Sequence, residues 1–296
     1  MLFPLSGVEC NPLGPPLVAL VVSFFTSMGG VSGAFLLLPY QMSVLGYTHP
    51  SVSATNQLYN VVATPGGVWR YVREGRMLWP LGWLVVLGTV PGVLAGAILR
   101  LQVLPDVASF KGFAGCVLLA LGLRMGRDVW RGGASRAGAR AMPADATVRV
   151  LERSRREVRY TFAGEEYRFS VAQVLALTFV VGIIGGAYGI GGGAFIAPFF
   201  VAVLGLPVHT VAGACLLGTC VTSVGGVIIY SCLAPLYPQY SVAPDWLLGV
   251  LLGLGGMAGT YLGARCQRYV NPRWIKAMLT LVLLFTAVQY LGAFLR

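Results

Sequence analysis

The fold is decided by residues 188–198, which read Tyr-Gly-Ile-Gly-Gly-Gly-Ala-Phe-Ile-Ala-Pro inside an apolar segment of the chain. Four glycines in the five positions 189–193 disfavour a continuous helix, because each costs about 1 kcal/mol relative to alanine. We therefore expect the helix to break here. Inside a bilayer such a break is tolerated only where the freed amides face protein or a water-filled cavity, and amides at the start of the resumed helix attract an anion.

The same glycine-rich stretch has two other possible interpretations. Small residues also allow two helices to pack closely, and this alternative stays open. A nucleotide-binding loop is excluded, because no Lys-Ser or Lys-Thr pair follows the glycines and both flanks are apolar.

A related stretch occurs earlier in the chain, where residues 29–39 read Gly-Gly-Val-Ser-Gly-Ala-Phe-Leu-Leu-Leu-Pro. Placing Pro39 on Pro198 requires a shift of 159 residues, and the same shift superposes several other glycines and leucines. These pairs are Gly30 with Gly189, Gly33 with Gly192, Leu45 with Leu204, and Gly66 with Gly225. Farther on the shift becomes 167, which aligns Gly92 with Gly259. We interpret the chain as a duplication with one loop insertion.

Composition places these repeats in a membrane. Of the 296 residues 56% are hydrophobic and only 10% charged, against about 25% charged in a soluble domain. A helix needs about 20 apolar residues to span a bilayer. The sequence therefore predicts an all-α polytopic membrane protein with two homologous halves of about four apolar segments each. The segments are residues 17–40, 44–69, 78–99, 107–126, 170–203, 209–232, 245–264 and 274–294.

A basic linker separates the halves. Between Arg124 and Arg168 lie 17 of the 31 charged residues, 11 of them arginine. Such a linker is expected in the cytoplasm, and two short alternating runs around Gly164 predict a small β-hairpin within it. The domains are thus residues 1–127, 128–169 and 170–296. The net charge of +11 is interpreted as a topology signal of a multi-pass inner-membrane protein, and nucleic acid is not expected as a partner.

The basic loops conflict with eight simple crossings. Arg70, Arg73 and Arg76 place the loop after the second segment inside the cell, and the basic residues between Arg265 and Lys276 place the loop after the seventh segment there too. Eight crossings would put these loops on opposite sides. The conflict disappears if the first two segments of each half form a re-entrant hairpin, with residues 231–245 outside. Inverted repeats with broken helices are typical of transporters.

Polar residues inside the apolar segments supply the remaining candidates for binding. Neutral amides and hydroxyls can hold an oxyanion without gripping it irreversibly, although interhelical hydrogen bonding is the alternative for each of them. We predict that they act together with the two glycine-rich stretches and without buried cations. The predicted substrate-binding residues are Gly30, Ser32, Gly33, Thr55, Asn56, Asn60, Tyr188, Gly189, Gly191, Gly192, Gly193, Thr219, Thr222 and Ser223.

Other chemistry is sparsely represented. His49 and His209 precede the second segment of their halves and are candidates for proton coupling, although each also fits an interfacial turn beside a proline. The six cysteines form no CxxC pair, so neither a metal site nor a cofactor is expected. No Lys or Arg precedes the first apolar run, which argues against a cleaved signal peptide.

Taken together, these residues resemble the sulfite exporter TauE/SafE family, also called the TSUP transporters. The resemblance covers residues 17–127 and 170–294 and lies in the glycine-rich stretch ending at Pro198, the Leu204–Pro207 turn, Ala54 to Asn56, and the pair Gly225 and Gly226. It implies a bacterial or archaeal inner-membrane carrier for sulfite, sulfoacetate or related organosulfur anions. In the first half Ser32 and Ala34 replace glycines, Gln57 stands where some relatives carry lysine, and the long basic linker is not universal in the family.

The predicted function is therefore a secondary transporter of small sulfur-containing oxyanions, and not an enzyme. The expected partners are the anion, membrane lipid, a coupling ion (proton or sodium) and a second copy in a homodimer. Three alternatives remain open: an anion channel, a carrier for non-sulfur carboxylates, and a membrane scaffold that acts through the basic linker.

Overall fold

The computed structural model describes residues 1–28, 32–130, 147–193, 196–197, 199–200, 204–266 and 272–295. Helices make up most of this part of the chain. They are α1 (Gly14–Met28), α2 (Ala34–Ser43), α3 (Ser51–Ala63), α4 (Pro65–Arg73), α5 (Trp79–Gln102), α6 (Val107–Trp130), α7 (Val171–Tyr188), α9 (Val208–Leu233), η1 (Ala234–Leu236), α10 (Trp246–Cys266) and α11 (Pro272–Phe294). The strands are β1 (Leu2–Phe3), β2 (Val8–Glu9), β3 (Arg149–Arg153), β4 (Glu157–Phe162) and β5 (Glu165–Ser170).

The helices have the length and apolarity that a bilayer demands. Within the described residues, five are long and apolar enough to span one, namely α5, α6, α7, α9 and α10. Large apolar side chains such as Leu87, Val180 and Phe285 are exposed on their outer faces, which suits contact with lipid. The prediction of an all-α polytopic membrane protein is confirmed.

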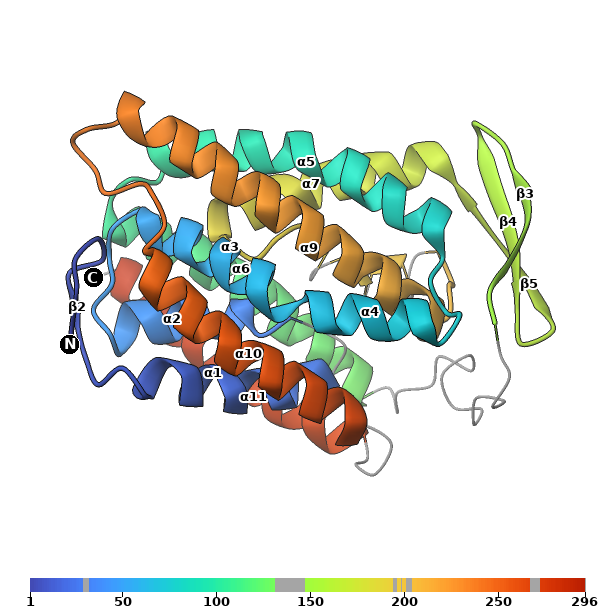
Figure 1. Ribbon diagram of the computed structural model, residues 1–296, viewed down its shortest axis with the longest axis horizontal. Helices are drawn as coiled ribbons and strands as arrows, with labels where there is room; N and C mark the ends of the chain where they lie inside the picture. Colours follow the sequence, from blue (N-terminus) through green and yellow to red (C-terminus); the bar gives the residue numbers. More distant parts are fainter. Residues whose placement is uncertain are drawn as a thin grey trace.

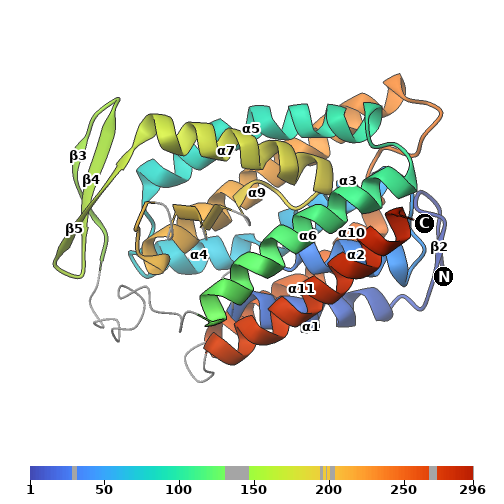
Figure 2. The same ribbon diagram turned by 180° about the vertical axis from the view of Figure 1, so that it is seen from behind.

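The bundle has two distinct ends (Figures 1 and 2). Strands β3 to β5 lie at one end, which we call the sheet end, and both chain termini lie at the other, the terminal end. Helix α3 followed by α4, then α5, then α6 run between the ends, and so do α9, α10 and α11. By contrast, α1 leaves the terminal end and α2 returns to it, while α7 and α9 both begin at the sheet end. The reversal in each half therefore lies within the first predicted segment, residues 17–40 or 170–203, and the two reversals point opposite ways. The expectation that the second segment takes part in the hairpin is wrong, because α3 with α4, and α9, run from one end to the other.

This reversal resolves the charge conflict in the sequence. Arg70, Arg73 and Arg76 all lie at the sheet end with the last turn of α10, whereas residues 234–245 lie at the terminal end (Figure 1). The break after α7 has a local cause. Gly189 adopts a left-handed conformation with φ of 84°, which ends a helix with least strain when the residue is glycine.

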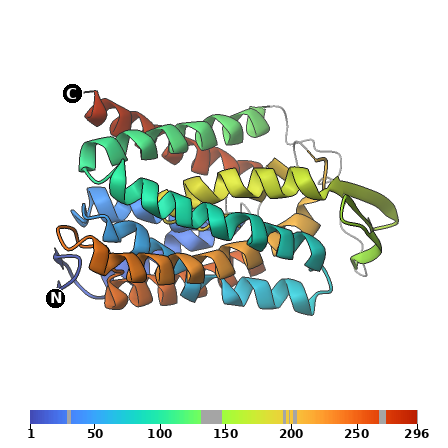
Figure 3. The same ribbon diagram turned by 90° about the horizontal axis from the view of Figure 1, so that it is seen from above.

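The two halves interlock through pairs of helices. Helix α5 packs along α7, α10 along α1, and α6 along α11, and Figure 3 shows the teal α5 beside the yellow α7 and the green α6 beside the red α11. The first apolar segment of each half (α1 or α7) thus contacts the third apolar segment of the other half (α10 or α5). This exchange is the packing that the predicted duplication would produce.

Glycines spaced four apart make both exchanged contacts possible. In α5 they are Gly88, Gly92 and Gly96, and in α10 they are Gly255, Gly259 and Gly263, each 167 residues later. A Cβ atom on Gly92 would lie 2.9 Å from Cα of Gly182, and one on Gly259 would lie 2.9 Å from the carbonyl carbon of Leu20. The backbones therefore touch, as in other small-residue contacts between membrane helices.

The predicted β-hairpin is present and is extended by a third strand. Strands β4 and β5 pair antiparallel through the turn at Gly164, and β3 pairs with the other edge of β4. The hydroxyls of Tyr160 and Thr210 lie 3.0 Å apart, and the amide of Val148 donates to the carbonyl of Gly75. These contacts dock the sheet onto the start of α9 and the turn between α4 and α5. Linker residues 131–146 lie outside the described residues.

The glycine contacts yield a stability prediction. We expect Gly259→Ala and Gly92→Ala each to lower the free energy of unfolding by about 1 to 3 kcal/mol, because the added methyl group overpacks a backbone contact. The midpoint of thermal unfolding in detergent measures this loss. Gly225→Ala is the matched control, since a Cβ at Gly225 meets nothing within 4 Å. Equal midpoints for Gly259→Ala and Gly225→Ala would contradict the packing.

The arrangement of the two ends yields a second prediction. In a background without native cysteines, Pro238→Cys should react with a membrane-impermeant maleimide added outside intact cells, whereas Ser154→Cys should react only after lysis. The positive-inside rule gives this orientation, because the arginine-rich loops lie at the sheet end. Labelling of the residue 238 thiol only after lysis would refute it.

Candidate functional site

The two reversals meet beside α3, inside the bundle. Pro39 in α2 has no backbone N–H, so the carbonyl of Phe35, four residues earlier, loses its helical partner. The hydroxyl of Tyr188, the last residue of α7, donates to this carbonyl at 3.0 Å. A proline in one half is thereby compensated by a tyrosine of the other half.

Polar side chains also satisfy the carbonyls exposed where α7 ends. A helix leaves the carbonyls of its last turn without internal partners, and inside a bilayer each must be paired by protein. Three donors lie on one face of α3, at Ser53, Gln57 and Asn60, and a fourth is Tyr230 of α9. The bonds are Tyr230 to Gly186 (2.9 Å), Ser53 to Ala187 (2.9 Å) and Asn60 to Ile190 (2.9 Å). Gln57 adds a 3.3 Å bond to the carbonyl of Gly185, which already accepts from the backbone amides of Gly189 and Ile190.

Asn60 joins both reversals. Its Nδ2 donates to the carbonyl of Ile190, and its Oδ1 accepts a 2.7 Å hydrogen bond from the hydroxyl of Ser32. One turn earlier, Asn56 donates to the carbonyl of Ala34 at 2.8 Å and accepts from Gln41 at 3.3 Å. The structure thus brings Ser32 into contact with Asn60 and places Asn56 one turn away, and the side-chain amide of each asparagine donates to a backbone carbonyl.

In the second half the glycines lie against α9. A Cβ on Gly191 would lie 2.6 Å from the hydroxyl of Ser223, and the amide of Gly192 donates to the hydroxyl of Thr222 at 3.2 Å. The hydroxyls of Thr222 and Thr219 donate to carbonyls of their own helix, at 2.6 and 3.0 Å. Such back-bonding leaves neither threonine hydrogen free.

A few polar groups at this junction are left over. The buried hydroxyl of Ser223 has no hydrogen-bond partner, nor has the Oε1 atom of Gln57. Among the residues that the structure describes, the amides of Gly191 and Gly193 also find no acceptor. Since buried polar groups are normally paired, these donors beside α9 are available to a ligand.

A cleft of about 70 Å³ lies beside α3 and α4, and of the predicted binding residues that the structure describes, Ser32 lines it whereas Gly191 and Ser223 do not. Its lining includes Ser32, Tyr59 and Thr64 together with two arginines, Arg70 in the last turn of α4 and Arg76 in the turn that follows this helix. Glu74 lies between the two arginines, with Oε1 3.0 Å from Nε of Arg70 and Oε2 paired with Arg76. Burial lowers the pKa of Arg76, because it disfavours the charged guanidinium.

The sequence analysis missed a buried cation. Arg100, near the terminal end of α5, has an exposed fraction of 0%. Its guanidinium lies 3.8 Å from the ring centroid of Phe110 and donates to the carbonyl of Leu104, while its Nε and Nη2 atoms have no partner. The expectation of a site without buried cations is therefore incomplete. The predicted apolar segment ended one residue before Arg100, but α5 continues to Gln102.

Two other predicted residues, Thr55 and Gly33, lie apart from the leftover donors. Thr55 accepts from the backbone amide of Asp245 at 2.9 Å and lies 2.9 Å from the hydroxyl of Tyr47, so it belongs to a network at the terminal end. Gly33 begins α2 and packs against Tyr59 and Ser23. Gly30 lies outside the described residues.

The two histidines occupy opposite ends of the bundle. His49 is exposed just before α3 at the terminal end, whereas His209 lies in the first turn of α9 at the sheet end (Figure 1). They cannot form one proton relay, and a coupling role for either stays a prediction. Among the described residues, no three His, Cys, Asp or Glu side chains are grouped as metal ligands.

Comparison with known proteins gives two matches. The sequence matches the family described as "Sulfite exporter TauE/SafE" over residues 16–290. It is also 23% identical over 292 residues to "Probable membrane transporter protein YunE" of Bacillus subtilis (strain 168), an alignment that covers 94% of this chain and 97% of that protein. No solved structure matches the chain.

The Asn60 bonds yield a third prediction. Asn60→Ala should lower the free energy of unfolding by about 1 to 3 kcal/mol, because the carbonyl of Ile190 then stays buried without a donor. Ser223→Ala is the control, since its hydroxyl has no partner to lose. Thermal unfolding in detergent compares them, and an Asn60→Ala protein as stable as Ser223→Ala would contradict the bridging role.

Proposed function

Because this chain belongs to the sulfite exporter TauE/SafE family, we propose that it is a secondary transporter that moves a small sulfur-containing oxyanion across the inner membrane. Sulfite, sulfoacetate and other organosulfonates are the substrates that the family resemblance favours. The name of the Bacillus subtilis relative also describes a membrane transporter. A transporter of this kind needs a path from one side of the membrane to donors within it.

The cleft beside α4 is the observation that carries the proposal. It joins two arginines at the basic end of the bundle to Ser32, which is bonded to Asn60 at the junction of the two reversals. A partly buried pair of guanidinium groups attracts an oxyanion electrostatically, and a planar guanidinium fits two oxygens of one anion. The proposed first contact of the anion is therefore Arg70 with Arg76.

The leftover donors beside α9 supply the proposed second contact. The hydroxyl of Ser223 and the amides of Gly191 and Gly193 are neutral, so they hold an anion less tightly than a buried cation would. This weakness suits a carrier, because the anion must also leave. Asn56 and Asn60 then act as supports that fix the position of the glycine-rich turns, and Thr219 and Thr222 as the wall behind them.

At the terminal end of the bundle, a buried arginine lies beside the junction, and a hydrogen-bonded N-terminal segment covers α10. Arg100 stacks on Phe110, whose ring centroid lies 6.4 Å from that of Tyr188. Toward the terminal end, Asp245 accepts from both the amide and the hydroxyl of Ser6, at 3.0 and 2.7 Å, and so ties the N-terminal segment over α10. We propose that this conformation faces the cytoplasm and that rocking of the two halves transfers the anion toward Arg100.

Glu74 has a specific place in this scheme. Its carboxylate already occupies both arginines of the cleft, so an incoming anion has to displace it. Each arriving anion thus takes the place of the Glu74 carboxylate on Arg70 and Arg76. Glu74 keeps the empty cleft from holding two unpaired buried charges, which would be costly.

The test is uptake of sulfite labelled with sulfur-35 into proteoliposomes. Arg70→Gln should raise KM about tenfold, because a charge-assisted hydrogen bond is worth about 1.5 to 3 kcal/mol. Arg73→Gln is the matched control, since Arg73 lies on the same helix but is exposed outside the cleft. Glu74→Gln should shift KM in the opposite direction by removing the competing carboxylate.

Three outcomes bear on the alternatives. Equal KM values for Arg70→Gln and Arg73→Gln would rule out the cleft as the path. Uptake that neither saturates nor shows counterflow would indicate a channel. Stronger competition by acetate than by sulfoacetate would indicate a carrier for carboxylates.

A further inference from the structure

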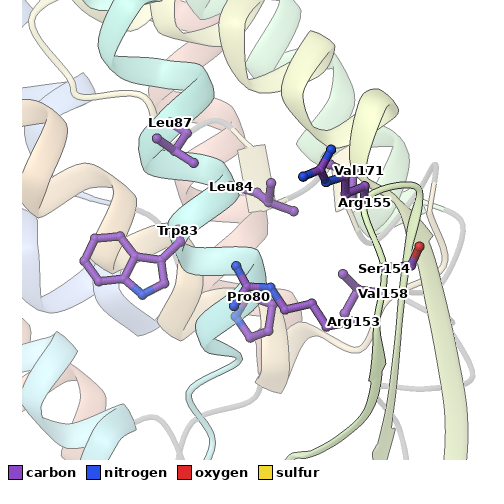
Figure 4. A pocket seen from close by; sticks show the side chains of 9 residues that line it. All are labelled: Pro80, Trp83, Leu84, Leu87, Arg153, Ser154, Arg155, Val158 and Val171. Carbon is purple, nitrogen blue, oxygen red and sulfur yellow. The ribbon is translucent and has the colours of Figure 1, made fainter.

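A second and larger cavity lies outside the proposed path, between α5 and the sheet (Figure 4). Its volume is about 430 Å³, within the range of clefts that hold small molecules. One wall is apolar and comes from Trp83, Leu84 and Leu87 of α5. The other wall comes from the sheet and the first residue of α7, with Val158 and Val171 facing the helix.

Two arginines frame the groove on the side of the sheet. Figure 4 shows Arg153 reaching from the end of β3 toward Pro80, and Arg155 lying beside Val171. Across the described part of the chain, neither forms an ion pair. The neighbouring acids are engaged elsewhere, since Glu157 lies 3.9 Å from Arg159 and 3.8 Å from Arg168, and Glu152 lies 3.8 Å from Arg159. The groove therefore carries two positive charges with no carboxylate to neutralise them.

The position of the groove relates it to the membrane surface. Trp79 and Trp83 begin α5 and are 45% and 49% exposed, and tryptophan is enriched where a helix enters the headgroup region. Farther along the same helix Leu87 and Leu94 are also exposed. The groove thus opens at headgroup depth and continues as an apolar surface along α5.

We propose that this groove binds an anionic phospholipid, with its phosphate between Arg153 and Arg155 and the start of an acyl chain against Trp83 and Leu87. Charge and apolarity together favour this occupant. A free phosphate would use only the arginines, and an apolar peptide would leave both charges uncompensated. The paired cations recognise the phosphate, and the exposed tryptophan and leucine recognise the chain.

The lipid would bridge two parts of the protein that otherwise touch through few bonds. Its headgroup contacts the loop between β3 and β4, and its chain contacts α5. The backbone bond from Val148, the residue before β3, to Gly75 is one of the bonds that hold the sheet against the helices. Binding in the groove is independent of the proposed transport path and stands or falls separately from it.

Native mass spectrometry of the full-length protein tests the assignment. With dioleoyl phosphatidylglycerol and dioleoyl phosphatidylcholine supplied at equal concentration, the protein should retain phosphatidylglycerol at least fivefold more. The double variant Arg153→Gln/Arg155→Gln should lose most of this preference. The double variant Arg73→Gln/Arg149→Gln removes the same charge from exposed positions outside the groove and should keep it.

Two further measurements distinguish a lipid headgroup from free phosphate and test whether the acyl chain of the lipid contacts the groove. Phosphatidylglycerol with brominated acyl chains should quench tryptophan fluorescence, and Trp83→Phe should reduce that quenching while Trp246→Phe, far from the groove in the chain and exposed to a similar extent, removes only its own share. Equal loss of preference in the two double variants would overturn the site in favour of general surface charge. Displacement of the lipid by 10 mM inorganic phosphate, or quenching unchanged in Trp83→Phe, would overturn the role of the acyl chain.

Discussion

A helix that ends inside a membrane must have its last carbonyls paired by the protein, and this constraint organises the centre of the molecule. Helix α7 ends at Tyr188, well inside the bundle, and side chains of the protein pair the carbonyls of Gly186, Ala187 and Ile190 that follow the last backbone-paired carbonyl, Gly185. A stripe of polar residues on α3 meets this need. The same stripe, through Asn60, holds Ser32 of the other reversal, so one constraint accounts for both the polarity of α3 and the meeting of the two halves.

The same constraint sorts the polar residues by what they can do. Four side chains of α3 donate to backbone carbonyls and so fix the position of the helix ends around them; they are Ser53, Asn56, Gln57 and Asn60. Among the described residues, the hydroxyl of Ser223 and the amides of Gly191 and Gly193 remain without a partner, and we propose that they receive an anion that first meets the two arginines of the cleft. A transporter benefits from this division, because a rigid frame can hold weak donors in place without binding the anion too tightly.

Much of this could be predicted from the sequence. Four glycines in residues 189–193 predicted a break in a helix, and the distribution of arginines predicted that the chain turns back once in each half, as it does before α3 and before α9. Periodicity could not reveal which polar residues would be used up by the backbone, since that depends on where α7 lies against α3. Nor could it reveal that Arg100 turns inward onto Phe110, or that Arg70 and Arg76 share a cleft with Ser32, because these contacts depend on how separate helices pack against one another.

The central claim is that the amides of the glycine-rich turn, left over after the carbonyls are paired, receive the anion. Amide hydrogen exchange of the protein in lipid nanodiscs, with and without saturating sulfite, tests this most directly. We predict that sulfite slows exchange in peptides covering residues 189–193 and leaves the buried centre of α10 unchanged. Unaltered exchange in residues 189–193, under conditions in which the same preparation transports sulfite, would contradict the account.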